Sequence, residues 1–115
     1  MRIRKARQIL KSFADDTRIR IISLLNKESL NVTELCEVIG KTQSNISKHL
    51  SRLRLTGVVT DERDGFNVYY RLTQPENKKH KVFINNIIKN LSDIEITKHD
   101  LDKLKQIKHN RKVIK

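Results

Sequence analysis

Residues 40–57, GKTQSNISKHLSRLRLTG, decide the fold of this chain. Three apolar side chains recur there at the i, i+4, i+7 spacing that marks one face of a helix: Ile46, Leu50 and Leu53. The pattern begins at Thr42 or Gln43 and reaches about Thr56, and Gly57 stops it because glycine ends helices readily. The sequence therefore predicts one helix with a buried stripe.

The opposite face of this predicted helix is polar and basic. The stretch from Lys41 to Arg54 has four basic residues and no acidic one. Short polar side chains at a helix N-terminus offer hydrogen bonds to base edges, and Lys and Arg neutralise phosphates. We predict that this helix contacts DNA through Gln43, Ser44, Asn45, Ser47, Lys48, His49, Ser51 and Arg52. The alternative is a solvated helix face without a partner, and His49, nearer the buried side, also suits a packing role.

Three helical patterns precede this helix. The first covers residues 3–14. An aspartate cap at residues 15–16 begins the second, over about residues 17–27, whose broad apolar face predicts a place at the centre of the core. Residues 31–34 (NVTE) have the form of a capping box and open a short third helix, which Gly40 ends.

Two β-rich runs follow the basic helix. They cover residues 58–60 and 67–72, and the Asp-Gly pair between them is a hairpin signal. Helix, helix, tight turn, helix and hairpin together make a winged helix-turn-helix, whose last helix enters the major groove. We expect three residues of the wing to reach the DNA backbone or the minor groove: Arg63, Asn67 and Arg71. One of Tyr69 and Tyr70 is expected to point into the packed face, because strand neighbours alternate.

The chain beyond the hairpin is predicted to be helical. Thr73 and Glu76 form a capping box around a proline, which predicts a fifth helix over about residues 75–92. Its apolar stripe is wider than one contact with a small body requires, so we expect an interface there. A sixth helix is expected to begin near Thr97, with Leu101, Leu104 and Ile107 inward.

These elements divide the chain into two parts. Residues 1–92 form the predicted domain, which contains the DNA-binding and dimerisation helices. Residues 93–115 form a basic C-terminal extension that is helical in part.

Three motifs resemble the ArsR/SmtB family. Residues 10–25 (LKSFADDTRIRIISLL) are similar to its opening, residues 42–50 (TQSNISKHL) to its recognition helix and residues 63–72 (RDGFNVYYRL) to its wing. The motifs anchor an alignment over about residues 6–92, in which Asp16 replaces the usual proline. The resemblance implies a mainly α winged helix-turn-helix fold with a small β-hairpin and five or six helices. It also implies a homodimeric repressor that binds a palindromic operator in double-stranded DNA.

The resemblance further implies that the first and last helices of the family domain form the dimer interface. We therefore predict that the following apolar residues lie there: Ile9, Leu10, Phe83, Ile84, Ile87, Ile88 and Leu91.

Charge and composition limit the class of protein. The 115 residues contain 25 Lys and Arg against 13 Asp and Glu, a formal net charge of +12, which indicates a polyanionic partner. The basic start lacks the apolar stretch and cleavage site of a signal peptide, and no run approaches the 18 apolar residues of a membrane span. We therefore expect a cytoplasmic protein that does not bind membranes.

In this sequence, metal ligands are missing from the positions at which metal sensors similar to the ArsR/SmtB family carry them. Cys36 is the only cysteine, and in the third helix the thiolate positions fall on Asn31 and Thr33. In the fifth helix, anchored on His80, the other ligand positions hold Lys78, Leu91 and Ile94. Two histidines and an aspartate of the extension, His99, Asp102 and His109, meet only loosely on one helix face. We predict no metal and no cofactor; an intersubunit disulfide or a sulfenic acid at Cys36 stays open.

No catalytic constellation is present in the sequence. Nothing places a nucleophile on a strained turn, and there is no glycine-rich phosphate loop, so we do not expect an enzyme. The main alternative to a sequence-specific regulator is a nucleoid-like or RNA-binding protein that uses its basic ends without discriminating sequences. The effector that would switch a regulator is not indicated by any residue.

Overall fold

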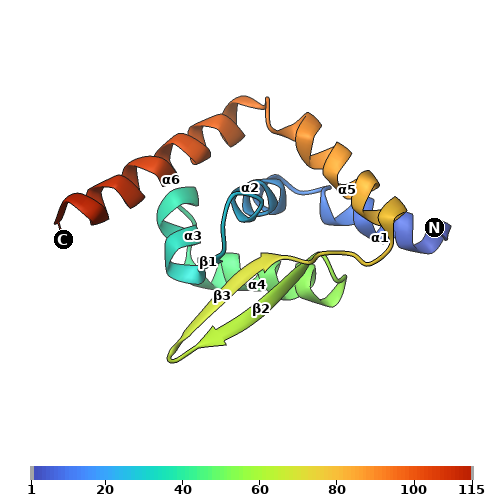
Figure 1. The fold of residues 1–115 in the computed structure, drawn as a ribbon, viewed down its shortest axis with the longest axis horizontal. Helices are drawn as coiled ribbons and strands as arrows, with labels where there is room; N and C mark the ends of the chain where they lie inside the picture. Colours follow the sequence, from blue (N-terminus) through green and yellow to red (C-terminus); the bar gives the residue numbers. More distant parts are fainter. Residues whose placement is uncertain (1, 115) are drawn as a thin grey trace.

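The computed structural model describes residues 2–114, with side chains over residues 2–110, and shows a body of helices from which a small sheet projects on one side (Figure 1). The elements are α1 (Ile3–Ser12), α2 (Asp16–Leu25), β1 (Leu30–Asn31), α3 (Val32–Ile39), α4 (Gln43–Leu55), β2 (Val59–Asp64), β3 (Asn67–Leu72), α5 (Lys78–Leu91) and α6 (Glu95–Ile114). This order is that of a winged helix-turn-helix, with α3 and α4 as the two helices of the motif.

The core forms around α2, as its broad apolar face predicted. Its buried apolar side chains are Ile21, Ile22, Leu24 and Leu25. The stripe of α4, predicted from its spacing, is fully buried against them. Each buried side chain of this size stabilises the fold by roughly 1.5–3 kcal/mol relative to exposure, so α4 is held firmly from below.

The predicted helix caps of the first half of the chain are confirmed. The Asp15 carboxylate accepts a hydrogen bond from the Arg18 backbone N–H at 3.0 Å. Asn31 and Glu34 form the reciprocal capping box of α3, with bonds of 2.8 and 3.0 Å. Gly40 ends α3 at φ 78°, a left-handed conformation that glycine adopts without a steric cost.

The predicted hairpin is present, and a third strand joins it. β2 and β3 pair antiparallel from Val59 opposite Leu72 to Asp64 opposite Asn67. β1 adds to the other edge of β3, so the strand order is β1-β3-β2. Tyr70 packs against the core, as expected for one of the two tyrosines.

The predicted start of the fifth helix is wrong. α5 begins at Lys78, after Asn77, whose side-chain oxygen accepts hydrogen bonds from the backbone N–H groups of Lys79 and His80. Thr73 does not cap a helix because the end of the sheet holds it. Its N–H donates to the Val58 carbonyl at 3.0 Å, and its hydroxyl bonds that of Thr60 at 2.9 Å.

The extension forms a long helix that packs on the body. α6 begins at Glu95, two residues before the predicted start, and Thr97 and Asp100 are buried. Leu104 is buried, and Leu101 and Ile107 pack against the core, as predicted. Lys108 tethers α6 to α3 through the Glu34 carboxylate at 2.8 Å.

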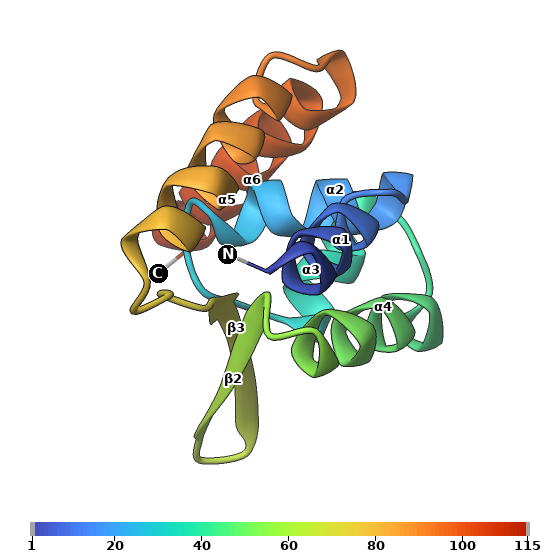
Figure 2. The same ribbon diagram turned by 90° about the vertical axis from the view of Figure 1, so that its right-hand side faces the viewer.

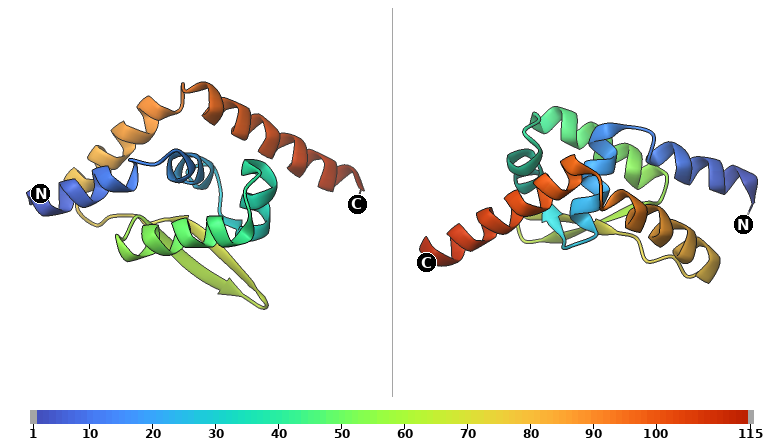
Figure 3. Two further views of the ribbon diagram at one scale, coloured as in Figure 1. Left: turned by 180° about the vertical axis from the view of Figure 1, so that it is seen from behind. Right: turned by 90° about the horizontal axis from the view of Figure 1, so that it is seen from above.

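The elements divide into two sides of the molecule. α5 and α6 form an arch over α2 on one side, and α4 with the β2–β3 hairpin lies on the other (Figures 1 and 2). Views from behind and from above place the two chain ends at opposite extremes (Figure 3). The side opposite the arch presents α4 and the β2–β3 hairpin together.

Candidate nucleic-acid interface

The recognition helix α4 starts at a side-chain cap. The Thr42 hydroxyl accepts a hydrogen bond from the Asn45 backbone N–H at 3.2 Å, which fixes the first turn. The cap leaves the N-terminal residues Gln43 and Ser44 exposed at the end of the helix that follows the tight turn. This is the end that contacts base edges in helix-turn-helix proteins.

Most of the predicted DNA-contacting side chains of α4 lie on its outer face, and His49 lies on its inner flank. Gln43, Ser44, Lys48, Ser51 and Arg52 are exposed, and Asn45, Ser47 and His49 are half-buried. The face therefore combines short polar groups at one end with the cation Arg52 two turns later.

The side chain of Asn45 contains a buried polar atom, Oδ1, that lacks a hydrogen-bond partner among the described residues. An unpaired buried polar atom costs about 1–3 kcal/mol. A partner that Asn45 could reach by rotating its side chain would remove this cost.

His49 packs on the inner flank of α4, as its position predicted. Its Nδ1 lies 3.8 Å from Oδ2 of Asp15. Burial lowers the pKa of His49, and Arg18, Lys48 and Arg52 add to the lowering, while Asp15 opposes it. His49 is therefore mainly neutral at pH 7, with its ring beside the N-cap of α2.

The wing presents its polar residues to solvent. Arg63 and Asn67 are exposed near the tip of the hairpin, and Arg71 is exposed with its Nε 3.9 Å from the Glu62 carboxylate. Phe66 stands fully exposed at the tip. It was not among the predicted site residues, although its place in the turn after Asp64-Gly65 could have pointed to it.

The wing is joined to α4 by an ion pair. Arg54 at the end of the helix lies 3.3 Å from the Asp61 carboxylate on β2. An exposed pair of this kind stabilises by less than about 1 kcal/mol, but it orients the two elements.

The predicted dimer residues divide into two groups. Leu10 is exposed, and Phe83, Ile84, Ile87 and Leu91 are half-buried. Ile9 and Ile88 are buried within the protomer, so they support this surface from below and are not available for contact. The structure adds exposed apolar residues to the surface: Ile3 of α1 and Val82 of α5.

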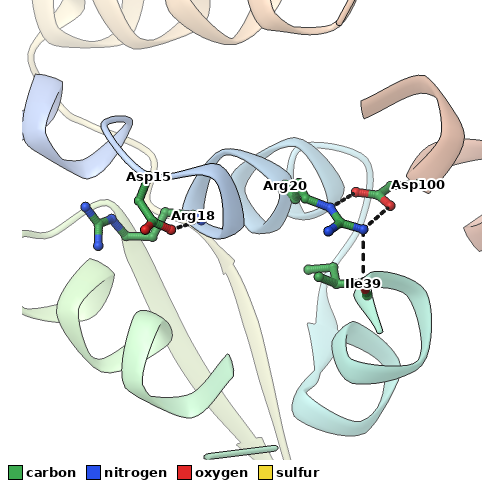
Figure 4. Close-up of polar contacts among 5 residues, drawn as sticks. All are labelled: Asp15, Arg18, Arg20, Ile39 and Asp100. Atoms are coloured by element: carbon green, nitrogen blue, oxygen red, sulfur yellow. Dashed lines mark hydrogen bonds and ion pairs between the residues drawn. The ribbon is translucent and has the colours of Figure 1, made fainter. Parts of the chain in front are cut away.

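Buried polar contacts hold the helices that carry the site (Figure 4). The Arg20 guanidinium donates to both carboxylate oxygens of Asp100, at 2.7 and 2.9 Å, and to the Ile39 carbonyl at 3.1 Å. Arg18 donates to the carbonyl oxygens of Lys11 and Ser12 at the end of α1. No local pattern in the sequence indicates these contacts, because they join residues on different helices.

The metal candidates stay apart in the described part of the chain. No group of three or more His, Cys, Asp or Glu residues that could hold a metal ion occurs among the described residues. Cys36 is half-buried, and burial raises the pKa of its thiol. The thiolate that metal binding and oxidation require is therefore disfavoured.

Comparison with known proteins agrees with this geometry. A family model described as bacterial regulatory protein, arsR family, matches residues 15–61. The transcriptional repressor PagR of Bacillus anthracis is 32% identical over 89 residues, which are 76% of this chain and 82% of PagR. The chain belongs to the ArsR family. The solved structure of HlyU from Vibrio cholerae matches this ArsR-family chain with a TM-score of 0.66 and 31% identity, over 76% of this chain and 88% of that one.

The ArsR-family chain spans about half the length of several curated relatives that it matches. One is the regulator KmtR of Mycobacterium tuberculosis, 35% identical over 65 residues, which are 56% of this chain and 50% of KmtR. KmtR is named as a transcriptional regulator and PagR as a transcriptional repressor, and this ArsR-family chain has the winged helix-turn-helix fold of the HlyU structure. None of its described helices combines the length and apolar character needed to cross a membrane.

Proposed function

We propose that this protein is a sequence-specific repressor that binds a palindromic DNA operator as a homodimer in the cytoplasm. The observation that carries the proposal is the acid-free outer face of α4, exposed beside the wing on one side of the molecule. Such a face fits the major groove, which admits one helix. PagR, a relative at 32% identity, is a transcriptional repressor, which supports the same direction of regulation.

Direct base contacts are assigned to the N-terminal end of α4. Ser44 and Asn45 lie where the helix enters the groove. The unpaired Oδ1 of Asn45 gains a hydrogen bond if the side chain turns to a base edge, so DNA binding removes a cost present in the free protein. The Asn side chain can bond adenine in a bidentate manner.

Backbone contacts are assigned to the remaining polar residues of the site. Lys48 and Arg52 on α4 carry positive charge toward the DNA strands. On the wing, Arg63, Asn67 and Arg71 extend the contact to the neighbouring backbone or minor groove. The Arg71 contact competes with Glu62, which lies 3.9 Å away.

The homodimer is proposed to form through α1 and α5. Leu10 on α1 is 53% exposed and Val82 on α5 is 58% exposed, values that leave large apolar side chains in water. Exposed apolar patches of this kind usually mark an interface. Covering both helices with a second copy would place two recognition helices about one DNA turn apart.

We also propose that residues 1–92 act as the DNA-binding and dimerisation domain and residues 93–115 as an extension. The extension is fastened to the domain, since α6 places Leu104 in the core and Asp100 against Arg20. Its role is therefore structural at the least.

Competition binding tests the proposed function. The DNA upstream of the gene and a random duplex of equal length would compete for the protein at physiological salt. We expect the upstream DNA to bind at least about a thousandfold more tightly, the lower end of specific recognition. Equal affinities would instead support a nucleic-acid-binding protein without sequence preference, for which the net charge of +12 is the favouring observation.

A further inference from the structure

A second cationic site lies beside the recognition helix. A pocket of about 300 Å³ lies between α1 and the C-terminal half of α4, lined by Gln8, Lys11, Ser12, Arg18, Arg52 and Thr56. Three of these residues are cations and none is acidic. A concave site lined by charges of one sign concentrates counter-ions, so this pocket attracts an anion.

Arg18 forms the inner wall of the pocket. Only 8% of this residue is exposed. Its Nε donates to the Ser12 carbonyl at 3.1 Å and its Nη2 to the Lys11 carbonyl at 3.0 Å. A guanidinium has five N–H donors, so three remain without a partner in the described part of the chain. Asp15 attracts Arg18 electrostatically, but its carboxylate bonds the backbone N–H and leaves the guanidinium donors unused.

Two exposed cations form the mouth of the pocket. Lys11 and Arg52 come from different helices, and neither side chain makes an ion pair or hydrogen bond with another described residue. The elements that carry them are joined in advance, since the Ser12 and Thr56 hydroxyls bond each other at 3.1 Å. The helix ends that carry Lys11 and Arg52 are therefore in place before any ligand arrives, with Arg18 between them in the wall of the pocket.

We propose that this pocket holds one backbone phosphate of duplex DNA among Lys11, Arg18 and Arg52. The proposal rests on the proposed function and extends its contact surface from α4 to α1. Arginine suits the role because its planar fork bonds two phosphate oxygens at once. In Figure 2 α1 lies above α4, and we place a DNA strand that borders the major groove beside the pocket that the two helices share.

The salt dependence of DNA binding tests whether two cations share one phosphate. Affinity for a random-sequence duplex would be measured against salt for the wild type, Lys11→Ala, Arg52→Ala and the double variant. Each lost phosphate interaction lowers the slope of log K against log salt by about 0.9, so losing one per protomer lowers it by about 1.8 for the dimer. We expect the slope to fall by about 1.8 in each single variant and by the same amount in the double variant, because all three disrupt the same phosphate site in both protomers.

Lys98→Ala is the matched control. Lys98 is an exposed lysine, and its helix α6 lies on the side of the molecule away from α4, so its removal should leave the slope unchanged. An unchanged slope for Lys11→Ala, or a fall of about 3.6 in the double variant, would overturn the shared phosphate site.

A second measurement separates the DNA phosphate from a free anion. Inorganic phosphate would be titrated into the free protein while the amide resonances of Gln8 and Ser12 are followed. Saturable binding that Lys11→Ala abolishes, together with a DNA slope that the variant leaves unchanged, would assign the pocket to a free anion and overturn the proposal. If the slopes change as expected but the protein binds upstream and random DNA equally, the phosphate site is retained and the proposed function is rejected.

Arg18→Lys tests the inner wall while keeping the charge. The variant is to be compared at a temperature where circular dichroism shows it folded, because Arg18 also bonds the end of α1. We expect weaker binding to all duplexes with a nearly unchanged salt slope, since the charge remains and the planar fork is absent. An affinity equal to that of the wild type would contradict a contact by Arg18.

Discussion

The carboxylate of Asp100 accepts two hydrogen bonds from the Arg20 guanidinium, which joins the start of α6 to α2 (Figure 4). The same guanidinium donates to the carbonyl of Ile39, the last residue of α3. One side chain therefore connects the extension, the central helix and the helix-turn-helix.

Removal of Asp100 should destabilise the fold strongly. Asp100 is 1% exposed, so Asp100→Ala leaves the Arg20 charge with no carboxylate partner. Removing one partner of a buried pair costs about 3–5 kcal/mol, which urea unfolding would measure. The control is Asp102→Ala, an exposed acid on the same helix, which should change stability by less than about 0.5 kcal/mol. Equal effects of the two variants would mean that the pair does not hold α6.

Asn45 and Arg52 should affect DNA binding in different ways. Asn45 lies at the end of α4 that enters the groove, so Asn45→Ala should cost about 1–3 kcal/mol against the operator and little against random DNA. Arg52 lies two turns later, so Arg52→Ala should weaken both DNAs alike. Binding isotherms for both duplexes provide the comparison. The opposite pattern would mean that the helix docks in another orientation.

Ile87 tests the dimer surface. It is half-buried on α5, and a carboxylate there would be buried if a second copy covered the helix. Ile87→Asp should therefore yield monomers with greatly weakened operator binding, as sedimentation and binding assays would measure. Asn85→Asp, an exposed neighbour on another face, is the control and should stay dimeric. A dimer of unchanged stability in Ile87→Asp would place the interface elsewhere.

His49 predicts a decrease of stability in mild acid. Burial lowers its pKa below the ordinary value of 6.5, so the unfolded chain binds the proton more tightly. Stability from the neutral ring is complete above pH 6.5 and falls as the pH drops below it toward the folded pKa. His49→Gln should flatten this part of the stability profile between about pH 5 and 7. An identical profile in wild type and variant would assign the pH dependence to other groups.

Zinc should not regulate DNA binding through α3 or α5. Cys36 and His80 each lack the further ligands that a tetrahedral site requires. Isothermal titration should detect no submicromolar zinc or cadmium binding. Tight binding that Cys36→Ser or His80→Ala removes would contradict this prediction.

The helix-turn-helix could be predicted because its signals are local. The stripe of α4 repeats at helical spacing, and the caps at Asp15 and Asn31 act within three residues along the chain. The same local reasoning was wrong at Thr73, where a good capping sequence is bonded instead to Val58 and Thr60 of the sheet. These contacts of Thr73 with the sheet prevent a helix from starting there.

The contacts that assemble the site were not predictable from spacing. Arg20 and Asp100 are eighty positions apart, and nothing near either residue indicates the other. β1 has two residues and is a strand only because β3 passes beside it. The pocket of Lys11, Arg18 and Arg52 likewise depends on how α1 and α4 cross.

Asn31 performs two tasks, as the last residue of β1 and the cap of α3. Its strand pairs with the wing at Tyr69, while its side chain fixes the first turn of the helix-turn-helix. Asn31 therefore fastens the hairpin to the first helix of the helix-turn-helix, so the two elements resist independent rotation. If the wing and α4 both contact the operator, as we propose, DNA whose groove spacing differs from the spacing of these two elements has to bend to meet both.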